Sequence, residues 1–209
     1  MCSNFILKQK CPNIEVSIVE KNSTELDKSL TSGEIDFAVM HALPFYENSK
    51  NANIDIYPLS RDPLLLVTKK GHPLGKYATP LKGSEYSKID LSLFADEPFV
   101  MVNKEQKIRQ AVDLILHNAQ IDPFITLTTK SYETARRLAC EGIGSTFVPL
   151  QYINIFPGSY QPDYYHLDAK YSPYWTLCVA VQKNAYVSKA AQLFVRIVSE
   201  RFGETVLNL

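Results

Sequence analysis

The sequence predicts an α/β protein, because two patterns recur along its 209 residues. Short apolar runs of strand length alternate with longer segments whose apolar residues recur at helical spacing, as in a sheet covered by helices. The chain is also long enough to bury one large core or two small ones. We therefore expect an α/β fold built as one large domain or as two small domains.

The predicted strands are short apolar or alternating runs bounded by turn residues. IEVSIVE alternates apolar and polar side chains, whereas IDFAVM is typical of a buried strand and follows Gly33, which ends the preceding helix. Strands are predicted over residues 14–20, 35–40, 63–68, 97–102, 124–129, 145–149 and 177–181.

The predicted helices are indicated by polar caps and by apolar stripes. The helix over residues 22–30 begins with Asn22 or Ser23 as its N-cap. Further helices are expected around 108–116, over 131–142, and near the end of the chain, where Leu193, Phe194, Ile197 and Val198 share one side. NFILKQK is helix-like but follows no strand, and the aromatic stretch with Pro157, Pro162 and Pro173 is expected to be loose.

Composition and charge argue against several classes of function. The 22 basic and 22 acidic residues balance, so no strong field attracts nucleic acid or an anionic membrane. The four cysteines form no C-x-x-C pair, which argues against a zinc site and against a disulfide framework.

No metal site, cofactor or catalytic residue is expected, since motifs such as H-E-x-x-H and G-x-S-x-G are absent. With neither a signal-peptide pattern nor an apolar run of about 20 residues, we expect a cytoplasmic protein.

The glycines of ARRLACEGIGSTFVP raise the question of a phosphate-binding loop. Such a loop runs from a strand through glycines into a helix, so that free N–H groups point at the anion. Here a helix ends at Gly142 and a strand begins after Gly144. Gly142 is better explained as a left-handed C-cap, and Gly144 as the turn into the next strand.

Several segments, in the same order, resemble the effector-binding domain of LysR-type transcriptional regulators. They are SYETARRLACEGIGSTFVP, LKQKCPNIEVSIVEKNSTELDKSLTSGEIDFAV, PLLLVTKKGHPL and DLSLFADEPFVMV, and the resemblance runs from about Leu7 to Phe202. It implies a fold like that of the type II periplasmic binding proteins, with two α/β subdomains and a central ligand cleft.

The resemblance also implies a domain organisation. Subdomain I is expected over residues 1–66 plus 177–209, and subdomain II over residues 67–176. The first strand of subdomain I is expected to be missing. The family's helix-turn-helix is missing as well, so the chain is expected to carry no DNA-binding domain.

Open α/β sheets bind ligands at helix N-termini and at the carboxyl ends of strands. In subdomain I, Ser23 and Thr24 begin a helix and suit a carboxylate or another small anion, whereas the ordinary alternative for Ser23 is capping. The resemblance favours ligand contact, because the family often has an effector-binding polar residue here. Met40 and His41 end a strand whose register points one of them into the cleft, with ordinary packing as the alternative for the histidine.

The subdomain II candidates lie where strands give way to helices, or on the strand after the glycines. Capping is the alternative for the polar residues, and core packing for the apolar ones. These candidates are Asn103, Gln106, Thr129, Ser131, Phe147 and Pro149. Arg136 and Arg137 suggest an anion clamp, but such a helical pair is usually solvated surface.

The sequence thus predicts a sensory domain that binds a small polar or anionic metabolite between two subdomains. Such binding would control transcription by the full-length regulator. The resemblance implies a homodimer, a tetramer for the full-length protein, and DNA contact only through the absent helix-turn-helix, without a membrane partner. One alternative is the solute-binding protein of a transporter. A weaker one is an enzyme on the same fold, for which no nucleophile or acid–base pair is found.

Overall fold

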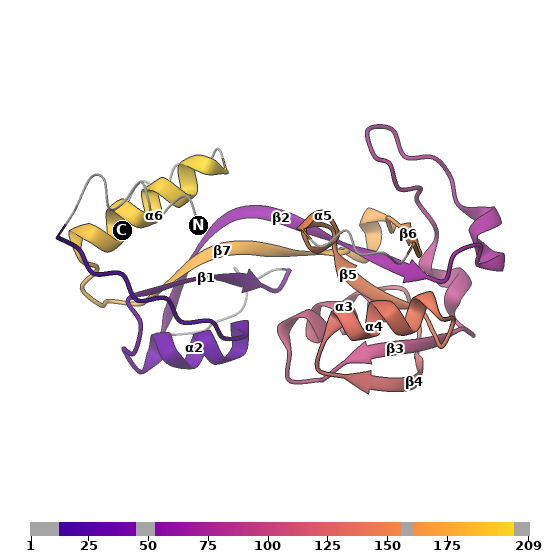
Figure 1. The fold of residues 1–209 in the computed structure, drawn as a ribbon, viewed down its shortest axis with the longest axis horizontal. Coiled ribbons are helices and arrows are strands. Elements are labelled where there is room, and N and C mark those ends of the chain that lie inside the picture. The colour runs from indigo at the N-terminus through magenta and orange to yellow at the C-terminus, as the bar shows by residue number, and fades with distance from the viewer. Residues whose placement is uncertain (1–12, 45–52, 156–160, 203–209) are drawn as a thin grey trace. The chain divides into compact units, whose positions relative to one another are not determined.

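The structure is a computed structural model, and it describes residues 13–44, 53–155 and 161–202 (Figure 1). Helices and strands alternate along these residues, which confirms the predicted α/β class.

The chain divides into two compact units. Unit 1 comprises residues 1–61 and 176–209, and unit 2 comprises residues 62–175. The chain passes between the units within two long strands, β2 (Ile54–Thr68) and β7 (Tyr174–Gln182).

Unit 1 has a sheet with one helix on each face (Figure 1). Strand β1 (Phe37–Ala42) pairs antiparallel with β7, which lies beside β2 in the order β1-β7-β2. Helix α2 (Ser23–Thr31) packs leucines against alternate residues of β1 and β7, whereas α6 (Lys189–Arg201) packs valines against the other face of β7. Because both faces of β7 are covered, its residues 177–181 form an uninterrupted apolar run.

Unit 2 combines a parallel strand pair with strands antiparallel to β2. Strand β3 (Pro98–Val102) leads through α3 (Lys107–Asn118) to β4 (Phe124–Thr129), which pairs parallel with β3. Both β5 and β6 pair antiparallel with β2. The remaining elements are α4 (Tyr132–Cys140), β5 (Thr146–Pro149), α5 (Leu150–Ile155), β6 (Asp163–Tyr165) and 3-10 turns at Pro73–Tyr77, Leu91–Phe94 and Ala169–Tyr171.

Two sequence predictions are wrong. Residues 14–20 form neither strand nor helix, and Ile18 is 67% exposed. Alternation alone does not make a strand, because the ladder needs a neighbour, and no described strand pairs with this run. The stretch expected to be loose contains α5 and β6, which pack on unit 2. The helix-like NFILKQK lies outside the described residues.

The glycine corner is structural, as predicted. Gly142 has a φ of 79° directly after the C-cap of α4. A Cβ on Gly144 would lie 2.9 Å from the carbonyl oxygen of Pro98, so the corner must run tightly along β3. Two backbone hydrogen bonds join Ser145 to this strand, through Pro98 and Val100.

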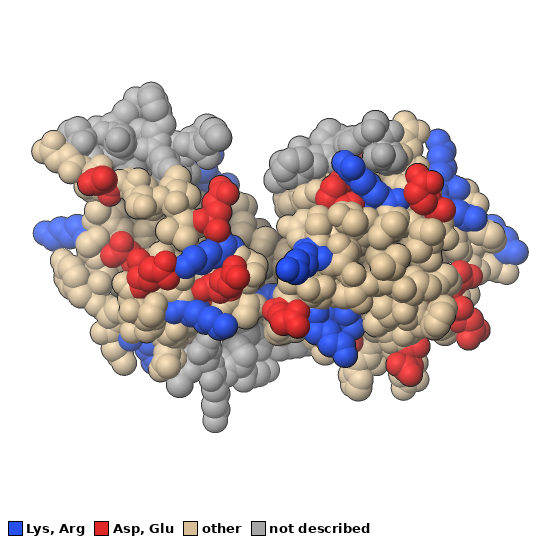
Figure 2. Space-filling model, turned by 60° about the horizontal axis from the view of Figure 1, so that its bottom comes forward, with Lys and Arg blue, Asp and Glu red and all other residues tan. Residues whose placement is uncertain are grey.

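The described surface carries mixed charge. Figure 2 shows Lys and Arg interspersed with Asp and Glu on the visible face. Among the described helices, none is both long enough and apolar enough to cross a membrane. The same residues contain no cluster of three or more His, Cys, Asp or Glu side chains placed to hold a metal ion.

Candidate functional site

The N-terminus of α2 is capped by Asn22 and not by Ser23. The Asn22 side chain accepts a hydrogen bond from the Glu25 backbone N–H at 3.0 Å, and the Glu25 carboxylate accepts one from the Asn22 N–H at 3.2 Å. This capping box satisfies two backbone donors reciprocally. Ser23 Oγ instead accepts a hydrogen bond from the His41 backbone N–H at 3.3 Å, which joins the start of α2 to the end of β1.

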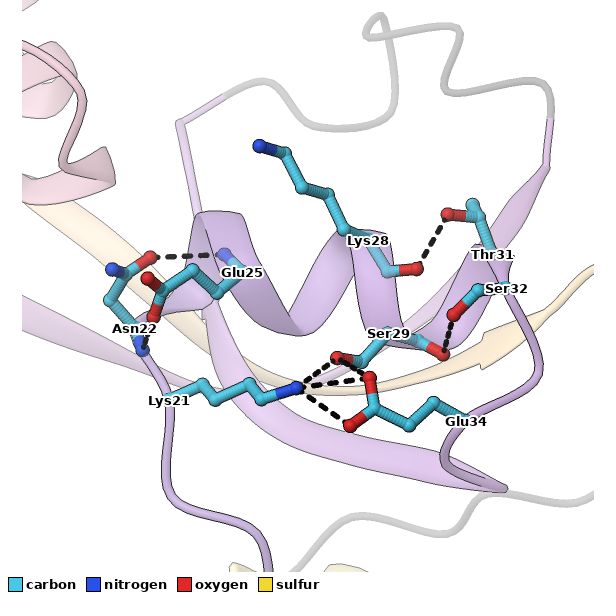
Figure 3. Close-up of polar contacts among 8 residues, drawn as sticks. All are labelled: Lys21, Asn22, Glu25, Lys28, Ser29, Thr31, Ser32 and Glu34. Atoms are coloured by element: carbon cyan, nitrogen blue, oxygen red, sulfur yellow. Dashed lines mark hydrogen bonds and ion pairs between the residues drawn. The ribbon is translucent and has the colours of Figure 1, made fainter.

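A second polar cluster fixes α2 from outside the helix (Figure 3). Lys21 Nζ donates to Ser29 Oγ at 2.9 Å and to the Glu34 carboxylate at 2.8 Å. Ser29 Oγ donates to the same carboxylate at 2.7 Å. The hydrogen bond from Lys21 is the main cause that lowers the pKa of Glu34. Because Lys21 precedes the helix and Glu34 follows it, the cluster holds both ends of α2 in place.

The two candidates at the end of β1 lie in different surroundings. Met40 is 3% exposed and packs in the core beneath α2, where Cys178 Sγ donates to its carbonyl oxygen. Successive strand residues point to opposite faces, so His41 points away from that core and is half-buried. Thr24, at the second position of α2, is also half-buried. Ligand contact by these residues stays a prediction.

In unit 2, four of the candidates come together at the carboxyl ends of β3 and β4. The Asn103 N–H donates to the Thr129 carbonyl oxygen at 3.0 Å, and Gln106 Nε2 donates to the Lys130 carbonyl oxygen at 2.7 Å. Ser131 begins the next helix within two residues of Thr129. The arrangement follows from the parallel pairing, which places both strand ends at one edge.

Two helices begin beside these side chains. Ser131 Oγ accepts a hydrogen bond from the Thr134 N–H at 3.3 Å and so caps α4. Gln106 is the N-cap residue of α3 but makes no capping bond with its side chain. Gln106 therefore contributes no side-chain capping bond to the first turn of α3. A helix start of this kind attracts a negatively charged group.

The two apolar candidates are buried in unit 2. Phe147 is 3% exposed and stacks on Phe99 with ring centroids 6.0 Å apart. Pro149 lies opposite Leu64 where β5 pairs with β2. Both residues therefore pack in the core of unit 2, and ligand contact by either stays a prediction.

A cavity of about 390 Å³ lies beside the four polar candidates of unit 2. It shares Asn103 with them, and its other lining residues are Lys104, Glu105, Arg109, Ile125 and Thr128. Arg109 is 4% exposed, and it donates from Nε to Asp113 at 2.7 Å and from Nη1 to the Val102 carbonyl oxygen at 3.0 Å.

Sequence reasoning missed Arg109 and Lys104. The apolar stripe of α3 consists of the neighbours of Arg109, and Lys104 has the sequence context of an ordinary loop lysine. One signal was present, because Arg109 and Asp113 are spaced for an ion pair on one helix face.

A smaller cavity of about 210 Å³ lies at the glycine corner and contains none of the candidates. His72 lines it and already has partners within unit 2. Its Nδ1 accepts from the Leu74 N–H, its Nε2 lies 3.6 Å from the Glu97 carboxylate, and its ring stacks on Phe94.

The arginine pair of α4 is not uniformly solvated. Arg137 is exposed, as expected, but for Arg136 the expectation is wrong, because its side chain is 2% exposed. Arg136 donates to Glu133 at 2.8 Å and to the Tyr164 hydroxyl at 3.1 Å. Burial by itself lowers the pKa of Arg136, but the bonds to Glu133 and Tyr164 outweigh it and raise the pKa.

Comparison with known sequences gives one family and a set of regulators. The family model described as "LysR substrate binding domain" matches residues 6–203. The uncharacterized HTH-type transcriptional regulator YcgK of Bacillus subtilis is 27% identical over 212 residues, which cover 96% of this chain and 63% of YcgK. The regulator AlsR of the same organism is 26% identical over 144 residues, covering 68% of this chain and 43% of AlsR. The chain thus spans less than two thirds of these relatives.

Comparison with solved structures gives the same fold. The effector-binding domain of QuiR in complex with shikimate matches with a TM-score of 0.76 at 18% identity, covering 96% of this chain and 88% of the other. The regulatory domain of CcmR from Synechocystis PCC6803 in complex with 2-PG has a TM-score of 0.76 at 20% identity, covering 96% and 89%. The BenM effector-binding domain with benzoate has a TM-score of 0.74 at 17% identity, covering 97% and 85%. These likenesses confirm the predicted fold, that of the type II periplasmic binding proteins.

Proposed function

The chain belongs to the LysR substrate-binding domain family, and from this premise we propose that it senses a small carboxylic acid for a transcriptional regulator. The curated relatives are named as transcriptional regulators and are longer than this chain. DNA binding and the control of transcription by the longer protein are therefore part of the proposal.

The observation that carries the proposal is the meeting of polar groups at the ends of β3 and β4. Asn103, Gln106, Thr129 and Ser131 lie there beside the N-termini of two helices. In unit 1, Ser23 and Thr24 lie at the N-terminus of a third helix. Within unit 2, the hydroxyl, amide and helix N–H groups suit a carboxylate. The ligands in the structures of two neighbours, shikimate with QuiR and benzoate with BenM, are also carboxylates.

Ligand binding can change the conformation of the regulator only if the ligand has different affinities for two conformations. A ligand shifts an equilibrium between two arrangements only if it binds one of them more tightly. The names of the relatives favour this regulatory role over that of a transporter's solute-binding protein. They also favour it over an enzyme, since these relatives are regulators.

A second copy of the chain is the proposed protein partner. Strand β4 pairs only with β3 among the described strands, so its other edge lacks a partner. Phe124 and Leu127 on this strand are 66% and 45% exposed. An apolar sheet edge of this kind is suited to association. We propose a homodimer here, a tetramer for the longer protein, and a cytoplasmic location, because the DNA target lies in the cytoplasm.

Thermal unfolding against a panel of carboxylic acids, amino acids, sugars and neutral amides tests this function. A ligand at about 100 times its dissociation constant stabilises a protein by about 2.7 kcal/mol. For a domain of this size the midpoint then rises by roughly 5–10 °C. We expect one class of acids to give this shift and Ser23→Ala to reduce it. Ser32→Ala, at the opposite end of α2, is the matched control and should keep the shift. A panel in which no compound raises the midpoint contradicts the proposal.

A further inference from the structure

The cavity beside β3 and β4 contains polar groups without partners in the described part of the chain. The Asn103 amide and the Lys104 ammonium group make no hydrogen bond to other described residues. The same holds for Nη2 of Arg109, since its two bonds use Nε and Nη1. No buried side-chain nitrogen or oxygen of the described residues lacks a hydrogen-bond partner, so the unbonded Nη2 of Arg109 lies where solvent or a ligand can reach it.

The charges around the cavity favour a singly charged anion. Lys104 and Arg109 are positive and Glu105 is negative, so the lining carries one net positive charge. Asp113 holds Nε of Arg109 and does not line the cavity. A planar guanidinium group matches a carboxylate better than a point charge does. Ile125 adds an apolar wall for the carbon skeleton of a ligand.

We propose that this cavity is the acid-recognition subsite of the domain and that Arg109 is its main specificity-determining residue. The subsite holds one carboxylate of a small monocarboxylic acid against Nη2 of Arg109, with Asn103 and Lys104 as further donors. Glu105 disfavours a second negative charge on the same ligand. The inference rests on the proposed function, because it names the chemical class of the effector and the group that recognises it.

Acetate and acetamide are the probes for this subsite, because they have the same size and differ in charge. The whole chain is titrated with each at constant ionic strength, and NMR follows the backbone amides of residues 103–109 and the Nε–H of Arg109. We expect acetate to shift these signals and acetamide to leave them unchanged. Arg109→Gln should weaken acetate binding by about tenfold or more, the value of one hydrogen bond to a charged group.

Substitutions at exposed residues keep the test valid if the Arg109→Gln variant does not fold. Lys104→Gln should weaken acetate binding by about threefold and Glu105→Gln should tighten it by about as much, as expected for partly solvated charges. Lys130→Gln is the matched control, since Lys130 is exposed, lies nearby and does not line the cavity. It should bind acetate as the unmodified chain does.

The subsite is ruled out if acetate leaves the signals of residues 103–109 unchanged. It is also ruled out if Lys104→Gln and Glu105→Gln bind acetate as the unmodified chain does. The thermal panel reports on the proposed function separately. An acid that raises the midpoint without touching Arg109 leaves the function intact and overturns only the subsite. If acetate binds at Arg109 but no compound of the thermal panel raises the unfolding midpoint, the subsite is supported and the sensory role is contradicted.

Discussion

At the residue scale, two adjacent arginines of α4 bind the same carboxylate, but one of them is buried and the other is exposed. The side chain of Arg136 is 2% exposed and that of Arg137 is 57% exposed, and both donate to Glu133. Tyr152 also donates to Glu133, at 3.1 Å, and Tyr164 accepts from Arg136. Arg136 therefore joins α4 to β6 and Glu133 joins α4 to α5, whereas Arg137 only adds charge to the surface.

This difference predicts unequal effects of the same substitution. Arg136→Gln should lower the free energy of unfolding by about 3 kcal/mol, because it removes one partner of a buried, hydrogen-bonded pair. Arg137→Gln should change it by less than about 0.5 kcal/mol, as for other exposed pairs. Urea unfolding of the two variants measures both values. Equal losses would show that the burial of Arg136 has no energetic consequence.

Asp90 predicts a specific pH dependence. A hydrogen bond from the Tyr171 hydroxyl at 2.6 Å is the main cause that lowers the pKa of Asp90 from 3.8 to about 2. A lowered carboxyl pKa stabilises the fold above the unfolded value of about 4, and this contribution is lost as the pH falls towards 2. Tyr171→Phe should return the pKa of Asp90 towards 3.8. A carbon-detected NMR titration would contradict this if Asp90 titrated alike in both proteins.

At the scale of single elements, α2 shows how local sequence places a candidate site. Asn22 and Glu25 close the capping box, and the Lys21–Glu34 pair spans the helix. The start of α2 is thereby fixed, with Ser23 directed at the His41 backbone. A ligand group at this helix start would meet N–H groups that are already in place.

Loss of the cap should destabilise the chain in a graded way. Asn22→Ala removes the acceptor for the Glu25 N–H and should cost about 1 kcal/mol of unfolding free energy. Asn22→Ser keeps a capping oxygen and should cost much less. Thermal or urea unfolding of both variants gives the comparison. A serine variant as unstable as the alanine variant would mean that capping does not stabilise α2.

The elements also show what sequence patterns can and cannot predict. Helix α3 and strand β4 follow from periodicity, and the meeting of Asn103 with Thr129 follows from parallel pairing. The strand predicted over residues 14–20 does not form, because alternation does not supply a partner. Arg109 was missed for a similar reason. Burial of one polar side chain beside a cavity depends on tertiary packing, which no local pattern records.

At the scale of the whole molecule, the edge of β4 predicts the oligomeric state. The chain should be a dimer in solution, and Phe124→Lys with Leu127→Lys should make it monomeric, because exposed lysines on a sheet edge prevent pairing. Ile143→Lys is the control, since Ile143 is similarly exposed, at 43%, but lies outside β4. Light scattering after gel filtration gives the mass. A double variant that remains dimeric would place the interface elsewhere.

The central claim is that this domain binds a small acid at the candidate residues, and NMR mapping tests it most directly. The acid that gives the largest thermal shift is titrated into the labelled chain, and the affected backbone signals are assigned. We predict changes at Ser23, Thr24 and His41 in unit 1 and around Asn103–Arg109 and Thr129–Ser131 in unit 2. Changes confined to other residues, such as those of the glycine corner, would contradict the claim.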